Sequence, residues 1–136
     1  MVSEHAPESR HLSVVIARDW REVAAFAGSE EHLPDWAAGL ASGALRREGD
    51  ELVVDSPMGE VRVRFAAPND LGVLDHDVRL PDGTVVHNPL RVLAHPRGAE
   101  VVFTLRRLEG VTADAFEADA QAVTADLARL RALLEQ

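Results

Sequence analysis

TADAFEADAQAVTADLARLRALLE, residues Thr112 to Glu135, is the stretch that decides the fold. Its apolar side chains recur at alternating spacings of four and three residues, which places them on one face of an α-helix. They are Phe116, Ala120, Val123, Leu127, Leu130 and Leu134. At about 1.5 Å per residue this helix is roughly 35 Å long, which is enough to cross a small sheet. Thr112 is expected to cap its N-terminus.

Short segments with the period of β-strands precede this helix. The first strand is predicted at His11 to Ala17, and two short helices follow, one capped by Asp19 and one between Glu30 and Leu40. Six further strands are predicted at 44–47, 51–55, 61–66, 71–80, 84–94 and 100–108. The turn Pro81-Asp82-Gly83 joins two of them as a hairpin with a bulge.

This order predicts an α+β fold with the element sequence β-α-α-β6-α. Because the loops between strands are short, consecutive strands are expected to be antiparallel neighbours in one seven-stranded sheet. Residues 1–10 read as a flexible N-terminal tail, and residues 11–136 read as a single domain. A curved sheet around one long helix can enclose a pocket, so the pattern favours binding of a small molecule.

Composition excludes several classes of partner. The chain has 136 residues, of which 46% are hydrophobic, and a formal net charge of −9. Nucleic-acid binding is disfavoured because it needs a basic surface, and an anionic membrane surface is disfavoured for the same reason. No apolar run approaches the ~20 residues of a membrane span, and the polar N-terminus is unlike a signal peptide. We therefore expect a cytoplasmic protein without membrane insertion.

Missing residue types restrict the chemistry further. The chain has no Cys, no Tyr and no Lys, so thiol nucleophiles, phenolic acids and lysine Schiff bases are excluded. No two histidines have the spacing of a zinc site, and no glycine-rich phosphate loop is present. We therefore expect no metal site and no cofactor. Catalysis, if there is any, would depend on His, Asp, Glu, Ser, Thr, Asn, Arg or Trp.

Four stretches resemble the SRPBCC superfamily, the START/Bet v 1-like and polyketide-cyclase-like proteins. They are SVVIARDWREVAAFA at 13–27, EHLPDWAAGL at 31–40, GVLDHDVRLPDG at 72–83 and EVVFTLRRLEGVTADAFEADAQAV at 100–123. The resemblance implies the helix-grip fold, in which a curved seven-stranded antiparallel sheet wraps around the C-terminal helix and leaves a cavity. Family members do not share one reaction. The absence of tyrosine and the aliphatic inward positions disfavour cyclase chemistry.

His76 is the leading candidate for a polar group inside the pocket. By strand alternation it shares a face with Leu74, Val78 and Leu80, which are apolar. It could therefore bond a ligand or transfer a proton, since an imidazole titrates near neutrality. The alternative is a partly buried histidine bonded to a backbone carbonyl.

The neighbours of His76 in the sequence are expected on the other face of the strand. Asp75, Asp77 and Arg79 have the opposite parity and are interpreted as facing solvent. Neither carboxylate is then placed to orient the imidazole, so a catalytic dyad is discounted.

Asn88 has the parity of apolar residues on the partner strand, and a buried amide must find partners. Counted from the hairpin turn, it lies close to the level of His76, so the two could converge on one ligand. Alternatively, Pro89 marks a bulge at which Asn88 satisfies local backbone. Trp36, in the second short helix, either closes over a ligand near the pocket mouth or fills a gap beneath the sheet.

The remaining pocket candidates are apolar. The full predicted set is Trp36, Phe65, Leu74, His76, Asn88, Phe103, Phe116, Ala120 and Val123. Three functions remain open: binding of a small hydrophobic molecule, a cyclase- or dehydratase-like enzyme with His76 as general acid/base, and an interaction domain similar to co-chaperones of the superfamily. A homodimer through an edge strand also stays open.

Overall fold

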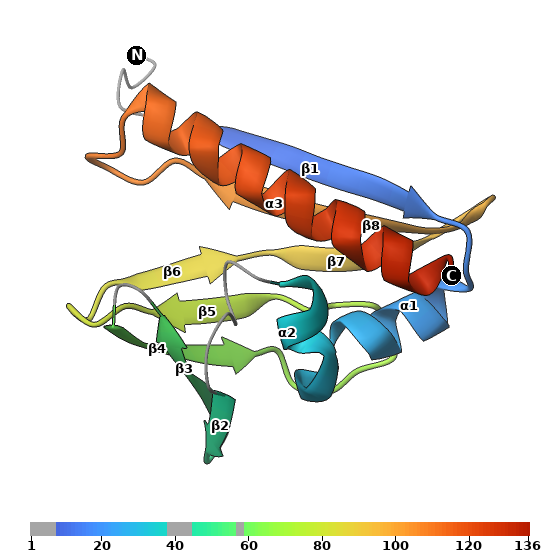
Figure 1. The fold of residues 1–136 in the computed structure, drawn as a ribbon, viewed down its shortest axis with the longest axis horizontal. Coiled ribbons are helices and arrows are strands. Elements are labelled where there is room, and N and C mark those ends of the chain that lie inside the picture. The colour runs from blue at the N-terminus through green and yellow to red at the C-terminus, as the bar shows by residue number, and fades with distance from the viewer. Residues whose placement is uncertain (1–7, 38–44, 57–58) are drawn as a thin grey trace.

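The computed structural model describes residues 8–37, 45–56 and 59–136, and its helices and strands follow the predicted order (Figure 1). The elements are β1 (Ser9–Ile16), α1 (Trp20–Ala27), the 3₁₀ turn η1 (Glu30–His32), α2 (Leu33–Trp36), β2 (Leu45–Glu48), β3 (Glu51–Ser56), β4 (Gly59–Phe65), β5 (His76–Arg79), β6 (Val85–Asn88), β7 (Leu90–His95), β8 (Gly98–Arg106) and α3 (Ala113–Leu134). Together they form the α+β helix-grip fold.

Two predicted element boundaries and most of the predicted tail fall on residues that the structure does not describe. They are the end of the second helix at Leu40, the strand start at Ala44 and residues 1–7 of the predicted tail. Ser9 and Arg10 do not belong to a tail. They pair with Arg106 and Leu105 of β8, so the first strand begins two residues earlier than predicted.

The long helix α3 forms as its sequence predicts. The side chain of Thr112 accepts a hydrogen bond from the backbone N–H of Ala115 at 3.1 Å, which satisfies one of the free donors at the helix start. Five of the six residues on the apolar face are buried: Phe116, Ala120, Leu127, Leu130 and Leu134. Only Val123 is half-buried, and it lies next to a cavity described below.

The strands form two antiparallel sheets instead of one. The first has the order β1-β8-β7 and the second the order β2-β3-β4-β5-β6, so there are eight strands where seven were predicted. The extra strand arises at Pro89, which divides the predicted strand 84–94 into β6 and β7. Proline has no N–H to donate to a strand ladder, so pairing is interrupted there and the chain passes from one sheet to the other.

Regular pairing is also interrupted in the segment just before β5. The carboxylate of Asp75 accepts the backbone N–H of Leu90 at 3.0 Å, where a carbonyl would accept it in a regular ladder. Both oxygens of Asp75 also bond the guanidinium of Arg91, at 2.7 and 2.6 Å. The interpretation of Asp75 as solvent-facing is therefore wrong, since its side chain is 16% exposed. These bonds hold the pKa of Asp75 below its usual value, chiefly through Arg91.

The hairpin of β5 and β6 confirms the predicted turn. Gly83 donates its N–H to Leu80 O at 2.9 Å and has a φ of 90°, which glycine adopts readily. Leu80 in turn donates to Thr84 O at 2.8 Å and closes the bulged hairpin. This register pairs His76 directly with Asn88 across the two strands.

Helix α3 covers only part of the two sheets. Figure 1 shows α3 lying along β1 and β8, with α2 beside its C-terminal half and the β5–β6 hairpin at a distance from its N-terminal half. The C-terminal end is fixed to the turn after β1, because Arg18 donates to Leu134 O at 2.9 Å and Glu135 accepts the N–H of Ala17 at 2.8 Å. The C-terminal end of the helix is therefore tied to the first sheet.

Candidate functional site

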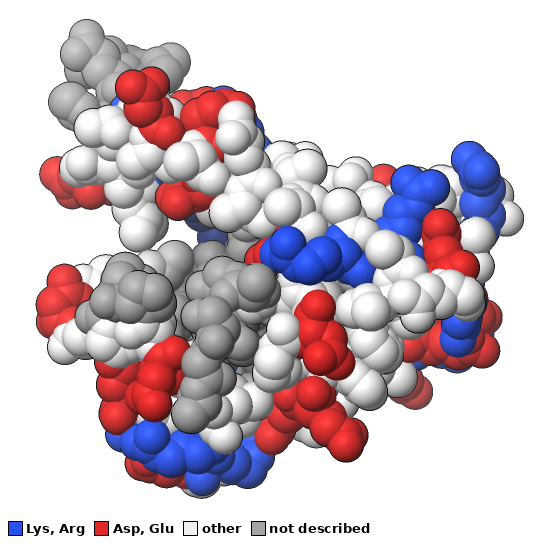
Figure 2. Space-filling view, in the orientation of Figure 1, with Lys and Arg blue, Asp and Glu red and all other residues white. Residues whose placement is uncertain are grey.

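A cavity of about 330 Å³ lies between α3, α2 and the concave side of the β5–β6 hairpin. Figure 2 shows the surface hollowed between the N-terminal half of α3 and this hairpin. The lining residues are Leu33, Trp36, Ala37, Phe65, His76, Val78, Val86, Asn88, Leu90, Phe103, Leu105, Asp119, Ala122, Val123, Asp126 and Leu127. Most of them are apolar, so the cavity matches the size and character of small-molecule sites in proteins.

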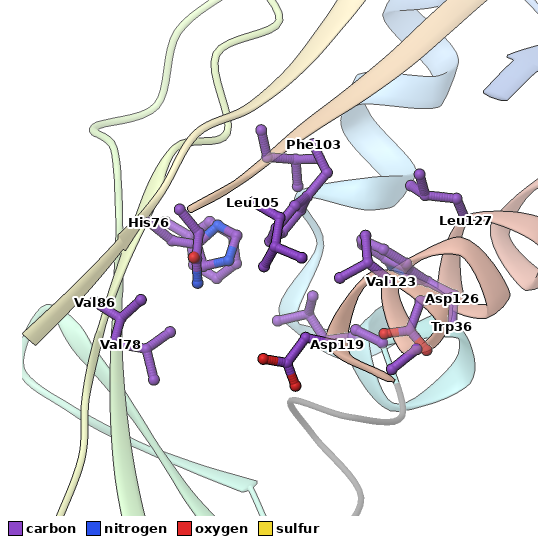
Figure 3. Close-up of a pocket in the computed structure, with 16 residues that line it drawn as sticks. Trp36, His76, Val78, Val86, Phe103, Leu105, Asp119, Val123, Asp126 and Leu127 are labelled. Carbon is purple, nitrogen blue, oxygen red and sulfur yellow. The ribbon is translucent and has the colours of Figure 1, made fainter. Parts of the chain in front are cut away.

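His76 is the most buried polar side chain of this wall. It projects from β5 into the cavity and is 5% exposed (Figure 3). Its Nδ1–H donates to the carbonyl oxygen of Leu74 at 3.0 Å, which leaves Nε2 as an acceptor in the neutral ring. The ring centroid lies 5.0 Å from that of Phe65 and 6.1 Å from that of Phe103. The alternative given by the sequence is therefore met, because the imidazole bonds a backbone carbonyl, and the ring also lines the cavity.

Burial determines the charge of this imidazole. Loss of hydration lowers the pKa of His76 below its ordinary value, against a smaller opposing effect of the hydrogen bond to Leu74. The ring is therefore neutral at pH 7. Neither adjacent carboxylate contacts it, because Asp75 bonds Arg91 and Asp77 bonds His87 at 2.6 Å on the outer face. Neither neighbouring carboxylate therefore forms a dyad with His76, as strand alternation predicts.

His76 should make stability depend on pH. Because its pKa is lowered by folding, the unfolded chain binds the proton first, and the free energy of unfolding falls as pH drops below the ordinary value of 6.5. The loss from this group at about pH 5.5 is at most about 1.4 kcal/mol. Urea denaturation of the wild type and of His76→Phe at about pH 7.5 and about pH 5.5 measures it. A wild-type loss no larger than that of the variant would contradict a buried neutral ring.

Asn88 lies directly across from His76, as counting from the turn predicts. Its side chain is half-buried, lines the cavity and has no hydrogen-bond partner within the described part of the chain. The amide is therefore free to donate or accept a hydrogen bond inside the cavity. Pro89 is indeed at a break between strands, yet Asn88 does not use its side chain to satisfy local backbone there.

Trp36 closes one side of the cavity from α2. The side chain is 5% exposed, and α2 is held to α3 by a bond of 3.3 Å from Arg129 Nε to the carbonyl of Trp36. Its indole Nε1 is buried and has no partner among the described residues. Because that nitrogen is buried, the residue offers the cavity its apolar ring and no accessible donor.

Two carboxylates of α3 were missed by the sequence analysis. Asp119 and Asp126 both line the cavity, four residues before and three residues after Val123. Figure 3 shows both carboxylates on the α3 side of the cavity, across from His76. Asp126 pairs with Arg129 one turn further along α3, whereas Asp119 has no ionic partner among the described residues. Their helical spacing from Val123 was the signal that could have found them.

Three predicted pocket residues are located elsewhere. Phe116 and Ala120 are buried on the face of α3 that packs on the first sheet, and Arg10 lies over the Phe116 ring at 5.1 Å. Leu74 precedes β5 and lies against Gly28 of the segment after α1. It lines a separate, more polar hollow beside α1. Six of the nine predicted residues do line the cavity: Trp36, Phe65, His76, Asn88, Phe103 and Val123.

In residues 8–37, 45–56 and 59–136, no group of three or more His, Asp or Glu side chains is placed to hold a metal ion. No helix of the same residues is long and apolar enough to cross a membrane.

The fold resembles that of several solved structures. DynU16, a protein of the dynemicin biosynthetic locus, matches with a TM-score of 0.72 and 13% identity over 94% of this chain and 47% of its own. The Aha1 dimer from Colwellia psychrerythraea matches with a TM-score of 0.72 and 12% identity over 94% and 96%. An uncharacterised protein from Rhizobium leguminosarum matches with a TM-score of 0.64 and 17% identity over 96% and 97%.

Sequence comparison adds no closer relative. No protein-family model matches the chain, and no curated protein matches it either. At identities below 20%, the structural matches concern the arrangement of helices and strands. The chain therefore shares its helix-grip fold with these proteins.

Proposed function

We propose that the protein binds a small, mainly apolar molecule in the cavity between α3 and the β5–β6 hairpin. The observation that supports this most is the cavity itself, since about 330 Å³ between the helix and the second sheet is not filled by side chains. A space of this size with an apolar wall and few polar groups is suited to a ligand of low polarity.

The polar groups of the cavity would orient the ligand. His76 offers the Nε2 lone pair from one strand, and Asn88 offers an amide from its cross-strand partner position. The rings of Phe65 and Phe103 flank the imidazole, so a ligand reaching Nε2 would contact aromatic faces. The ring of Trp36 would cover the ligand from α2.

Membership of the SRPBCC superfamily is part of this proposal. The sequence stretches that resemble the superfamily, the helix-grip fold, and the likeness to DynU16 and Aha1 all support it. The chain spans about half of DynU16, so a role in the biosynthesis of a natural product is a hypothesis only. Because Aha1 is a dimer, a homodimer through an edge strand is a further hypothesis for this chain.

Titration with N-phenyl-1-naphthylamine, a neutral probe whose fluorescence rises in apolar surroundings, tests the proposal. We expect saturable binding with one site per chain, and we expect His76→Ala to weaken it about fivefold, the effect of one neutral hydrogen bond. Native mass spectrometry of freshly purified protein should also reveal ligand carried through purification. Absence of saturable probe binding to the wild type would refute the proposal.

An enzyme is the second candidate function, and the neutral state of His76 favours it. Its tautomer is fixed by Leu74 O, so Nε2 could act as a general base toward a bound molecule. In that case His76→Gln should lower turnover of a ligand recovered from the protein by about 100-fold while leaving its affinity within a few-fold. Equal turnover by both proteins would rule this role out.

An interaction domain without a ligand is less favoured. That function needs a filled interior together with an apolar outer surface. Leu71 and Leu93 are exposed, at 73% and 46%, but the interior keeps the cavity described above.

A further inference from the structure

The wall of the cavity offers hydrogen-bond acceptors and almost no donors. Nε2 of His76 is an acceptor, since Nδ1 carries the proton that bonds Leu74 O. Asp119 and Asp126 contribute only acceptors. Trp36 Nε1 could donate, but it is buried out of reach. Among the lining side chains that the structure describes, the amide of Asn88 is the one accessible group that can donate, and it can also accept.

The charged side chains that line the cavity are acidic. Within the described part of the chain, the lining includes no Arg and no Lys. Arg129 is the nearest cation on α3, and it is already paired with Asp126 and bonded to the carbonyl of Trp36. Asp119 is left without an ionic partner among the described residues, so the cavity wall has an uncompensated negative charge.

The two sides of the cavity differ in burial. His76 is almost fully buried and is flanked by aromatic rings, and its free nitrogen has no partner among the described residues. Asp119 is exposed, and Figure 3 shows its carboxylate across the cavity from His76. A ligand would therefore place its apolar part toward Phe65 and Phe103 and a charged group toward the solvent-exposed side.

We infer that the ligand is an apolar molecule that carries a protonated amino group, and that Asp119 binds this group at the exposed side of the cavity. This inference rests on the proposed binding function and adds the chemical class of the ligand. A carboxylate or sulfonate in the same position would face Asp119 without a counter-ion, so anionic amphiphiles such as fatty acids are disfavoured. Because Asp119 is exposed, the preference is expected to be moderate.

Displacement of N-phenyl-1-naphthylamine by three ten-carbon compounds tests the inference. Decylamine, decan-1-ol and decanoate have the same chain and differ in head-group charge, and all are used below their micelle-forming concentrations. In about 0.15 M salt, which screens distant charges, decylamine should bind about tenfold more tightly than decanoate, with the alcohol between them. In Asp119→Asn this ratio should fall to about threefold.

Asp70→Asn is the matched control, because it removes the same charge from an exposed residue that does not line the cavity. Its amine-to-carboxylate ratio should equal that of the wild type. Equal binding of the three compounds, or an equal fall of the ratio in both variants, would overturn the amine preference while leaving the binding function intact. If the wild type does not bind the probe at all, the binding function itself fails.

Discussion

Replacement of Gly72 by alanine is expected to lower the free energy of unfolding by about 3 kcal/mol or more. Gly72 precedes β5 with a φ of 78°, and a Cβ atom there would lie 2.1 Å from the carbonyl oxygen of Val92. That contact is too short to be tolerated, so the two backbones must separate. Separation would break the 2.8 Å bond from the N–H of Val92 to Gly72 O and disturb the entry into the strand that carries His76.

Gly83→Ala serves as the control, because it shows how much of the loss in unfolding free energy comes from the positive φ alone, without a steric clash. Gly83 has a φ of 90°, but a Cβ atom there would meet nothing within 4 Å. This control should lose only about 1 kcal/mol, the usual cost of a left-handed conformation for alanine. Urea denaturation monitored by circular dichroism measures both variants. Equal losses for the two would show that the close approach of Gly72 to β7 is not present in solution.

Replacement of Val86 by tryptophan is expected to weaken binding of N-phenyl-1-naphthylamine about 100-fold, which corresponds to about 2.7 kcal/mol. Val86 lines the cavity from β6, opposite Val78 of β5, so the indole would occupy the space of the ligand. Val123→Phe fills the same space from α3 and should also abolish most of the binding. Because the two substitutions lie on different walls of the cavity, a local folding defect at one position would not explain a loss of binding in both variants.

Val85→Trp is the matched control for this experiment. Val85 is the preceding residue of β6, points to the other face and is 57% exposed. Its affinity for the probe should stay within about twofold of the wild type, because a surface substitution changes no cavity contact. If Val85→Trp weakened binding as much as Val86→Trp, the probe would be bound outside the cavity.

The parts of the fold that could be predicted from the sequence are those determined by local patterns. The four-and-three spacing of α3 required a helix with one apolar face, and its buried residues are those of the pattern. Pro81-Asp82-Gly83 required a tight turn, and that turn set the register that places His76 opposite Asn88. Strand alternation then placed Phe65, His76 and Phe103 on the inner face, and the structure shows their rings next to one another.

The remaining features depend on distances between segments that are far apart in the sequence. Alternation predicts that Asp75 faces solvent. Its carboxylate is instead held between the two sheets' strands by the backbone N–H of Leu90 and the guanidinium of Arg91. Leu74 has the parity of His76, yet it lies before β5, where alternation no longer applies. Asp119 was overlooked because a polar residue on a helix is normally assigned to solvent.

An isotope-filtered NOE experiment on the protein with bound N-phenyl-1-naphthylamine tests most directly whether the ligand occupies the cavity. The methyl groups of Val78, Val86 and Val123 should show NOEs to the aromatic protons of the probe, since these three residues line the cavity from β5, β6 and α3. NOEs confined to the exposed Leu71 and Leu93, with none to the three valines, would contradict binding between the helix and the sheet.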